Sequence, residues 1–431
     1  MASILVTVMP FAGHAAPVSG VVAELVHRGH DVAVYTGARY LDRFEKLGAR
    51  AIPWSAAPDF DEHNLPATFP QVGKRGAVGL LANLEHIFIR TGSGQATDMV
   101  AAHAVTPFDL IVGDVMSVGT GLAAELLELP WATLSIVPLS LPSVDMPPSG
   151  LALQPGFGAV GTVRDAVLRG VFRVASAPLD RAYRQVRAEL GLPKTHARFA
   201  DVLYSPWLVA ATGTPSLEYP RSDLGSQFHF VGRLAAASPA STEHPDWWPD
   251  LAAAATPVVL VTQGTFNIDP GDLLEPALRG LADSGALVLG TTAGASLTEI
   301  PGNARVAPYL PFADVLPLVD VAITNGGWGG VLETLSYGVP LIVAGGDLDK
   351  PEIAARVGWS GAGVDLGTGH PSDRAVARAY RRVKDTPGFS EKARAIAAEL
   401  ETLGGASTLA DLVEGLLATG EPVRRASNPW G

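Results

Sequence analysis

The sequence predicts an α/β fold in which two Rossmann-like domains, each with a parallel sheet, face one another. Short β-branched runs such as residues 4–8 and 258–262 have the pattern of strands buried on both faces, as parallel strands are. Helical patterns alternate with these runs, which is typical of doubly wound sheets. A Pro- and Ser-rich stretch, residues 235–257, separates two such series and is the predicted linker.

The composition limits the classes of protein to consider. A chain of 431 residues predicts two domains, and 47% hydrophobic with 17% charged residues indicates a globular chain. A net charge of −12 argues against nucleic acid or an anionic membrane as the main partner. The absence of cysteine excludes disulfides and thiolate chemistry and fits a cytoplasmic protein. No apolar run approaches the roughly 18 residues of a membrane span, so none is predicted.

The first half opens with a strand, a loop and a helix. Residues 4–8 form the strand, residues 9–17 the loop, and a helix follows from about Val18 to Arg28. Further strands are predicted at residues 31–36, 49–53, 110–113 and 132–137. A long Pro-, Ser- and Gly-rich loop over residues 138–157 precedes one helix over 164–190. Long loops in compact domains are often functional, so this loop is a candidate wall for a pocket.

The second half repeats the alternation. Strands are predicted at residues 258–262, 286–289, 304–307, 321–324 and 341–344, with a helix near 406–417. We therefore predict an N-terminal domain over residues 1–234 and a C-terminal domain over 258–417. The tail, residues 418–431, is expected to pack back on the N-terminal domain.

The most informative stretch is a glycine turn after the strand 321–324. Its four glycines, Gly326, Gly327, Gly329 and Gly330, precede a helical pattern. Glycines at a helix start allow a ligand close to the backbone, and the free N–H groups and helix dipole attract phosphate. Tight turns also use glycine without a ligand, so both interpretations stay open.

His14 follows the first strand, where open α/β sheets bind ligands. A nearby helix start lowers the pKa of an imidazole, and a neutral imidazole is a general base. The alternative is a loop histidine bonded to backbone. A base of this kind needs a carboxylate on its other nitrogen. Asp114 ends a strand of the same half, whereas Asp109 begins it and belongs at the opposite edge. The alternative role of Asp114 is a helix N-cap.

The glycine stretch resembles the donor-binding signature of nucleotide-sugar-dependent glycosyltransferases, the family of plant and bacterial natural-product and macrolide enzymes. Their His-Gly-Gly-x-Gly-Thr turn holds a diphosphate, a later Glu binds ribose, and an Asp-Gln pair binds the hexose. The residues that match these positions are Asn325, Gly326, Gly327, Trp328, Gly329, Gly330, Glu333, Asp349 and Lys350. Three of them depart from the pattern: Asn325 replaces His, Gly330 replaces Thr or Ser, and Lys350 replaces Gln.

Other segments carry the same resemblance. Gly264 and Thr265 resemble the family's turn facing the phosphates, although an ordinary strand-to-helix turn is the alternative. Tyr309 and Leu310 resemble its nucleobase segment, in which the ring stacks and the leucine backbone bonds the base; a core tyrosine is the alternative. Phe312 stands where Gln or His is usual. His14 and Asp114 match the family's base and its carboxylate partner.

The resemblance implies the GT-B architecture, with an acceptor-binding N-terminal domain and a donor-binding C-terminal domain. It implies an inverting transfer of a hexose or deoxyhexose from a UDP- or dTDP-linked donor to a small lipophilic natural product, as in antibiotic biosynthesis. No cofactor beyond this co-substrate is expected. Asp347 and Asp349 form an Asp-x-Asp motif, but two carboxylates alone are weak evidence for a metal site, and no metal is predicted. The oligomeric state stays open.

Two other functions are compatible with parts of the sequence. Residues 119–124 fit G-x-G-x-x-A after a strand, as in nicotinamide-dependent oxidoreductases, but no acidic residue ends the next strand. A nucleotide-sugar-binding protein without activity is the other alternative. Asn325 and Gly330 favour it, and the presence of both His14 and Asp114 argues against it.

Overall fold

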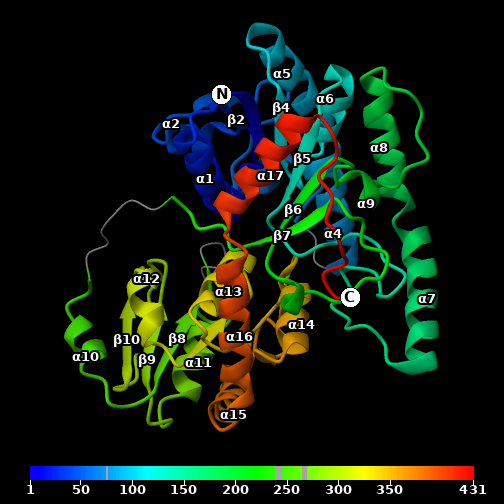
Figure 1. The fold of residues 1–431 in the computed structure, drawn as a ribbon. Coiled ribbons are helices and arrows are strands. Elements are labelled where there is room, and N and C mark those ends of the chain that lie inside the picture. The colour runs from blue at the N-terminus through cyan, green and yellow to red at the C-terminus, as the bar shows by residue number, and fades with distance from the viewer. Residues whose placement is uncertain (74–75, 238–243, 265–268) are drawn as a thin grey trace.

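The computed structural model describes residues 1–73, 76–237, 244–264 and 269–431 and contains two parallel sheets, one in each half of the chain (Figure 1). The N-terminal sheet has the spatial order β3 (Arg50–Pro53), β2 (Asp31–Thr36), β1 (Ser3–Thr7), β4 (Leu110–Asp114), β5 (Trp131–Ser135), β6 (Leu208–Thr212) and β7 (Phe228–Gly232). The C-terminal sheet has the order β10 (Ala304–Ala307), β9 (Leu287–Thr291), β8 (Val258–Thr262), β11 (Val321–Thr324), β12 (Leu341–Val343) and β13 (Gly363–Asp365). The α/β prediction with two Rossmann-like halves is confirmed.

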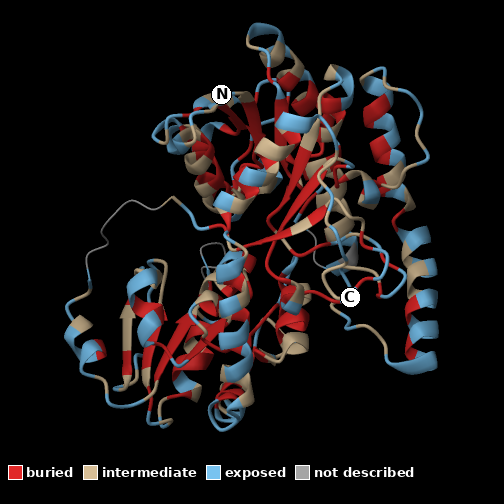
Figure 2. Ribbon diagram, in the orientation of Figure 1, coloured by how far each residue is buried: buried red, intermediate tan, exposed pale blue. Residues whose placement is uncertain are grey.

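Helices cover both faces of each sheet. In the first half they are α1 (Ala12–His27), α2 (Leu41–Glu45), α3 (Leu65–Thr68), α4 (Gly76–Asn83), α5 (Gly92–Val105), α6 (Gly119–Leu127), α7 (Gly158–Ala175), α8 (Ala177–Glu189) and α9 (Phe199–Val202). In the second half they are α10 (Trp248–Ala252), α11 (Leu274–Gly280), α12 (Phe312–Val315), α13 (Trp328–Ser336), α14 (Lys350–Ser360), α15 (Asp373–Lys384), α16 (Gly388–Thr402) and α17 (Ala406–Thr419). The central strands of each sheet are almost entirely buried, whereas the edge strands β3, β10 and β13 are partly exposed (Figure 2). Neighbouring residues Ile111 and Val112 of β4 enter different hydrophobic cores, one on each face.

The strand order reverses between β1 and β4 in the first sheet and between β8 and β11 in the second. In doubly wound folds, ligands bind outside the carboxyl ends of the strands at such a switch point. His14 follows β1 and Asp114 ends β4, while Gly264 follows β8 and the glycine turn follows β11. The topology therefore places the predicted residues at the two expected positions.

Helix α1 starts earlier than predicted. It begins at Ala12 and contains Pro17, so residues 12–17 of the predicted loop are helical. Its first N–H is satisfied from outside, because the Ala12 amide donates to the buried Glu62 carboxylate at 2.9 Å. An acidic group at this end also favours the helix through its dipole. His14 consequently lies in the first turn of a helix, not in a loop.

The helix predicted over residues 164–190 is two helices, α7 and α8. They meet at the buried Ser176, and Pro178 occupies the first turn of α8. Proline is tolerated in a first turn but interrupts a helix interior, which explains the break. The loop predicted before α7 is present. Strands β6, β7 and β13 were not predicted.

The chain returns to the N-terminal domain earlier than the predicted boundary at residue 417. The amide of Gly405 donates to the carbonyl of Val231 on β7 at 2.8 Å, and α17 then packs on the N-terminal sheet (Figure 1). Arg28, the C-cap of α1, pairs with Asp411 and Glu414 of α17, at 2.6 and 2.9 Å. Helix α17 therefore packs with the N-terminal domain rather than with the second sheet.

The tail and the linker also take defined places. Val423 donates its amide to the carbonyl of Trp207 at 2.9 Å, and the Trp430 indole donates to Pro215 at 3.0 Å, so the tail lies on the N-terminal domain. Residues 238–243 of the predicted linker lie outside the described residues. In the rest of the linker, the Trp247 indole donates to the carbonyl of Val306 at 2.9 Å, which attaches this part to the C-terminal sheet.

Candidate active site

His14 and Asp114 form a short hydrogen bond. Nδ1 of His14 lies 2.6 Å from Oδ2 of Asp114, which is itself buried at the end of β4. A carboxylate accepts from an N–H, so Nδ1 carries the proton and Nε2 keeps its lone pair. The side chain of His14 stays 16% exposed. This is the orientation that an imidazole base requires.

The backbone fixes the Asp114 carboxylate. Oδ2 also accepts from the Met9 amide at 3.0 Å, and Oδ1 accepts from the Met116 amide at 3.0 Å. Asp114 does not cap the next helix, whose N-cap residue is Val118. Asp109 accepts from the Ser3 amide at 2.8 Å, at the opposite edge of the sheet, as predicted. The sheet therefore orients one of these two carboxylates, Asp114, toward His14.

The pKa of His14 is raised, contrary to the expectation from the helix start. Burial is the largest single influence and lowers the pKa. The charge and hydrogen bond of Asp114 oppose it and, with smaller contributions from Asp349 and Glu62, outweigh it. An opposite charge in direct contact thus dominates over the helix terminus. The contribution from Asp349 also shows that a C-terminal-domain residue reaches the electrostatic environment of the imidazole.

The glycine turn leads directly into helix α13, and there is free space beside three of its glycines. Gly327 is the N-cap of α13, and Trp328, Gly329 and Gly330 form its first turn. The first N–H groups of a helix have no partner within it. A Cβ added at Gly327, Gly329 or Gly330 would meet no described atom within 4 Å. Gly326 has a different role: its φ is +89°, and a Cβ there would lie 2.8 Å from Val343.

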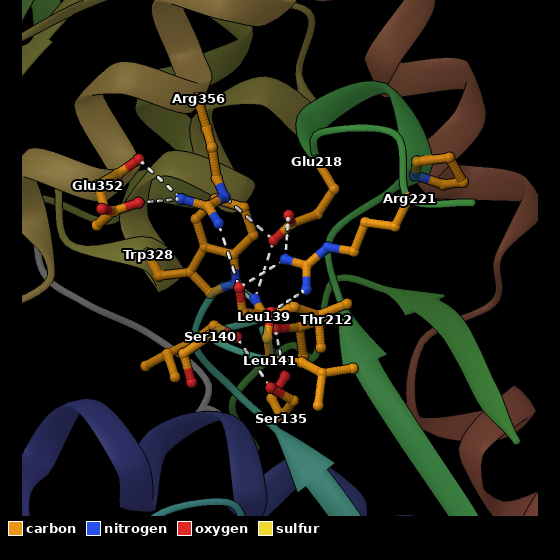
Figure 3. A network of polar contacts seen from close by, with 12 residues as sticks. Ser135, Leu139, Ser140, Leu141, Thr212, Glu218, Arg221, Trp328, Glu352 and Arg356 are labelled. Atoms are coloured by element: carbon orange, nitrogen blue, oxygen red, sulfur yellow. Dashed lines mark hydrogen bonds and ion pairs between the residues drawn. The ribbon is translucent and has the colours of Figure 1, made fainter. Parts of the chain in front are cut away.

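Trp328 and Asn325 point into the protein. The Trp328 indole is buried and donates to the Thr212 hydroxyl at 2.9 Å (Figure 3). The amide of Asn325 donates to the carbonyl of Gln263, which connects the ends of β11 and β8. The Trp328 side chain is therefore engaged with the N-terminal domain, and the predicted donor-binding role of this residue falls to its backbone. The sequence does not indicate the inward direction of the Trp328 side chain, because an aromatic residue beside glycines is equally compatible with stacking on a ligand.

The other predicted donor residues lie around the same sheet edge. Gly264 is exposed with φ at +72°, and Thr265 lies outside the described residues. Tyr309 is 65% exposed after β10, so it is not a core tyrosine, whereas Leu310 is buried. Glu333 faces Arg233 of the N-terminal domain, with 3.5 Å between Oε1 and Nη1. Desolvation raises the pKa of Glu333, and Arg233 partly offsets this.

Asp349 and Lys350 begin helix α14. Desolvation raises the pKa of the Asp349 carboxyl, although the side chain remains open to solvent, and His14 and Lys350 oppose the shift. Nζ of Lys350 donates to Oδ1 of Asp347 at 2.7 Å. The first carboxylate of the Asp-x-Asp motif is therefore already paired with a lysine. Among the described residues there is no group of three or more His, Asp or Glu side chains arranged to hold a metal ion.

Helix α14 also contacts the N-terminal domain through a buried ion network (Figure 3). Arg356 donates to Glu218 at 3.1 Å and to Glu352 at 2.7 Å. Glu352 in turn accepts from the amides of Gly150 and Ala152, both at 2.7 Å. One helix therefore carries Asp349 and Lys350 at its start and holds the loop over residues 138–157 one turn later. No local sequence pattern indicates this link.

An aromatic group beside His14 was also missed. The ring of Phe11 lies 5.5 Å from that of His14, 5.1 Å from Phe60 and 6.0 Å from Phe88. Phe11 is the N-cap of α1, in the short connection after β1, so its place at the sheet edge was predictable. Phe60 and Phe88 come from segments without regular patterning. The group gives the imidazole an apolar neighbour.

The glycines of the oxidoreductase pattern are packed against protein. A Cβ at Gly119 would lie 2.3 Å from that of Gln95, and one at Gly121 would lie 3.2 Å from Trp131. The Gly119 amide already donates to the Gln95 side chain at 3.0 Å. These glycines permit close packing and leave no room for a pyrophosphate, so the oxidoreductase alternative is not favoured. Separately, no helix in the described residues is long and apolar enough to cross a membrane.

Known proteins are similar to this chain over most of its length. Residues 282–410 match a family model described as the C-terminal domain of erythromycin biosynthesis protein CIII-like proteins. The 4'-demethylrebeccamycin synthase of Lentzea aerocolonigenes is 39% identical over 422 residues, which cover 96% of this chain and all of that protein. The fold matches the calicheamicin glycosyltransferase CalG4, with a TM-score of 0.75, 21% identity and coverage of 98% and 100%.

A second solved structure, the glycosyltransferase SsfS6 of Streptomyces sp. SF2575 complexed with thymidine diphosphate, matches with a TM-score of 0.65. Its identity is 21%, and the match covers 96% of this chain and 100% of that one. The near-complete coverage of a relative at 39% identity places the chain in one enzyme family. The chain belongs to the natural-product glycosyltransferases with the GT-B fold.

Proposed function

We propose that the protein transfers a hexose or deoxyhexose from a UDP- or dTDP-linked donor to a hydroxyl of a small lipophilic natural product, with inversion at the anomeric carbon. The observation that carries the proposal is the His14–Asp114 pair, whose Nδ1–Oδ2 distance is 2.6 Å and which lies near Asp349 of the other domain. The solved complex of SsfS6 with thymidine diphosphate supports a diphosphate ligand of this kind.

In the proposed reaction, Nε2 of His14 accepts the proton of the acceptor hydroxyl. The acceptor oxygen forms a bond to the anomeric carbon while the bond from that carbon to the diphosphate breaks. The leaving nucleoside diphosphate carries the electron pair away, and attack from the opposite side inverts the configuration. Asp114 stabilises the imidazolium that forms. The amides at Gly327, Gly329 and Gly330, with the α13 dipole, stabilise the developing phosphate charge.

The surroundings of the pair support a lipophilic acceptor. Phe11, Phe60 and Phe88 form an apolar group beside the imidazole, and aromatic rings favour flat apolar ligands. The loop held by Glu352 belongs to the same domain, and we assign it to the acceptor site. Tyr309, exposed after β10, is assigned to stacking on the nucleobase. Asp349 and Lys350 are assigned to the sugar.

A donor screen tests the proposal. UDP, dTDP and their sugar conjugates are compared by thermal shift, because a ligand that binds only the folded state raises the melting temperature. Donors that bind are then incubated with a panel of phenolic and alcoholic acceptors, and the anomeric configuration of each product is read by NMR. Retained configuration in every product, or no shift with any nucleotide, would contradict the proposal.

Lys350 provides a further check on the sugar site. Exchanging Lys350 for Gln, the residue at this position in the family pattern, is expected to change the ranking of donor sugars while UDP and dTDP themselves bind as before. An unchanged sugar ranking would remove Lys350 from the hexose site.

A further inference from the structure

Helix α7 exposes a stripe of valines to solvent. Val160, Val163, Val167, Val171 and Val174 are 60–85% exposed. At 3.6 residues per turn they lie on one face, over about 21 Å of helix. The helix lies at the edge of the molecule, away from both sheets, and most of its surface is exposed (Figures 1 and 2). We name these five residues the α7 stripe.

The opposite face of α7 is anchored, so the exposure of the stripe is a fixed property of the helix. Buried Asp165 accepts from the Gly156 amide at 2.8 Å, and Arg169 donates to the carbonyl of Met146 at 2.7 Å. Gly156 and Gly161 pack in direct backbone contact. These contacts hold α7 on the loop before it with the stripe facing outward.

We propose that the α7 stripe is a dimer interface at which two copies of this chain pack their α7 helices antiparallel about a twofold axis through Val167. The spacing carries the argument. Relative to Val167, the other valines stand at positions −7, −4, +4 and +7, so the stripe reads the same in both directions. An antiparallel twofold pairs Val160 with Val174, Val163 with Val171, and Val167 with its own copy. Such a self-complementary patch is what an isologous interface requires.

Charge is compatible with this arrangement. The stripe itself contains no charged residue, and Arg164, at position −3 beside it, faces Gly170 at position +3 of the second copy. The Arg164 guanidinium is also held by its own chain, donating to Asp165 at 2.8 Å and to the carbonyl of Gln154 at 2.7 Å, so no two cations meet across the axis. A membrane is a poorer occupant, because the chain carries a net charge of −12 and the stripe lacks the Trp, Tyr and Lys residues typical of membrane surfaces.

The area is sufficient for association. Five valines exposed to this degree form an apolar patch on the order of 500 Å², near the upper end for a typical monomer. Two such patches bury about 1,000 Å² in total, close to the lower end of specific interfaces, before the flanking residues are counted.

The oligomeric state of the full-length protein tests the proposal. Sedimentation velocity at micromolar concentrations is expected to give twice the 44.8 kDa mass of one chain. Val167→Asp places two carboxylates on the axis and is expected to give the single-chain mass with an unchanged circular dichroism spectrum. The matched control is Val105→Asp, at an 85% exposed valine that ends α5, and it should remain dimeric. A single-chain mass for the unaltered protein, or a dimeric Val167→Asp variant, would overturn the proposal.

Cysteine cross-linking tests the register, because the chain contains no cysteine of its own. With diamide as oxidant, Val167→Cys is expected to form a covalent dimer, as is the double variant V160C/V174C. V160C alone is not, since its partner position is 174 in the second copy. Cross-linking of V160C alone would exclude the antiparallel register. If the protein is monomeric and co-sediments with phosphatidylglycerol vesicles, and Val167→Asp abolishes this binding, the α7 stripe binds a membrane surface and the dimer proposal is wrong.

Discussion

The indole nitrogen of Trp328 donates a 2.9 Å hydrogen bond to the hydroxyl of Thr212, and both side chains are buried. Thr212 ends β6 of the N-terminal sheet and donates in turn to the carbonyl of Ser135 at 2.9 Å. Trp328 is the first residue of α13, directly after the N-cap Gly327. The helix start that we assign to the donor diphosphate is therefore attached to the domain that carries His14.

Removing the acceptor of this bond is expected to destabilise the protein. Thr212→Val leaves a buried indole N–H without its partner, which costs about 1–3 kcal/mol of unfolding free energy. Urea unfolding followed by tryptophan fluorescence measures the change. Thr212→Ser keeps the hydroxyl and is the matched control. Equal stability of the Val and wild-type proteins would mean that the bond contributes nothing to the domain contact.

The pH dependence of transfer reports the His14–Asp114 pair. Only the neutral imidazole accepts a proton, so the rate falls as pH decreases through the pKa of His14, which the carboxylate raises above its usual value. In Asp114→Asn the charge is gone and burial, which lowers the pKa, prevails. The acid limb of the kcat profile should move to lower pH, while kcat itself falls by roughly 10²–10⁴-fold.

Asp109→Asn is the control for this shift, because Asp109 lies at the opposite end of the same strand and bonds the Ser3 amide. Its profile is expected to match that of the unaltered protein. If the acid limb of the Asp114→Asn profile stays in place, Asp114 does not raise the pKa of His14.

Tyr309 is expected to contribute to nucleotide binding through its exposed ring. Base–aromatic stacking contributes about 1–3 kcal/mol, so Tyr309→Ala should weaken UDP or dTDP binding by roughly 5- to 150-fold. Tyr309→Phe keeps the ring and should bind as before. Calorimetric titration provides both constants. If the Ala and Phe variants bind equally well, the base is held elsewhere.

Glu352 is expected to act as a positioning residue for the acceptor. Its carboxylate holds the amides of Gly150 and Ala152 and pairs with Arg356, so Glu352→Ala releases the loop. Misplacement of about 1 Å can cost a large factor in rate, and we expect the acceptor KM to rise about tenfold while the donor KM stays constant. Glu391→Ala, on the exposed first turn of α16, is the control. A parallel rise in both KM values would indicate general loosening instead.

Local patterns predicted most of the fold and several of the site positions. The β-branched runs form strands of two parallel sheets, as predicted. Strand direction decides at which edge of the sheet a residue lies, so Asp109 and Asp114 lie at opposite ends of β4, as predicted. The glycine spacing likewise located the start of α13. These features depend on residues close together in the chain, so they can be predicted from sequence patterns.

Features that depend on distant contacts were not predictable. Helix α1 begins at Ala12, where Glu62, from a separate segment, accepts from its first amide. The pKa of His14 depends on Asp114, Asp349 and Glu62 together, so the helix start alone gave the wrong direction. The inward direction of Trp328 was not predictable for a related reason. Its partner Thr212 ends β6, a strand that the sequence does not predict.

The most direct test of the central claim is a paired measurement on His14→Ala. We expect the rate of transfer to the acceptor found in the screen to fall by about 10²–10⁴-fold. Calorimetric titration with UDP or dTDP should give the same dissociation constant as the unaltered protein, because the nucleotide is assigned to the other domain. Transfer that survives the substitution, or nucleotide affinity that is lost together with it, would contradict the separation of base and donor site on which the account depends.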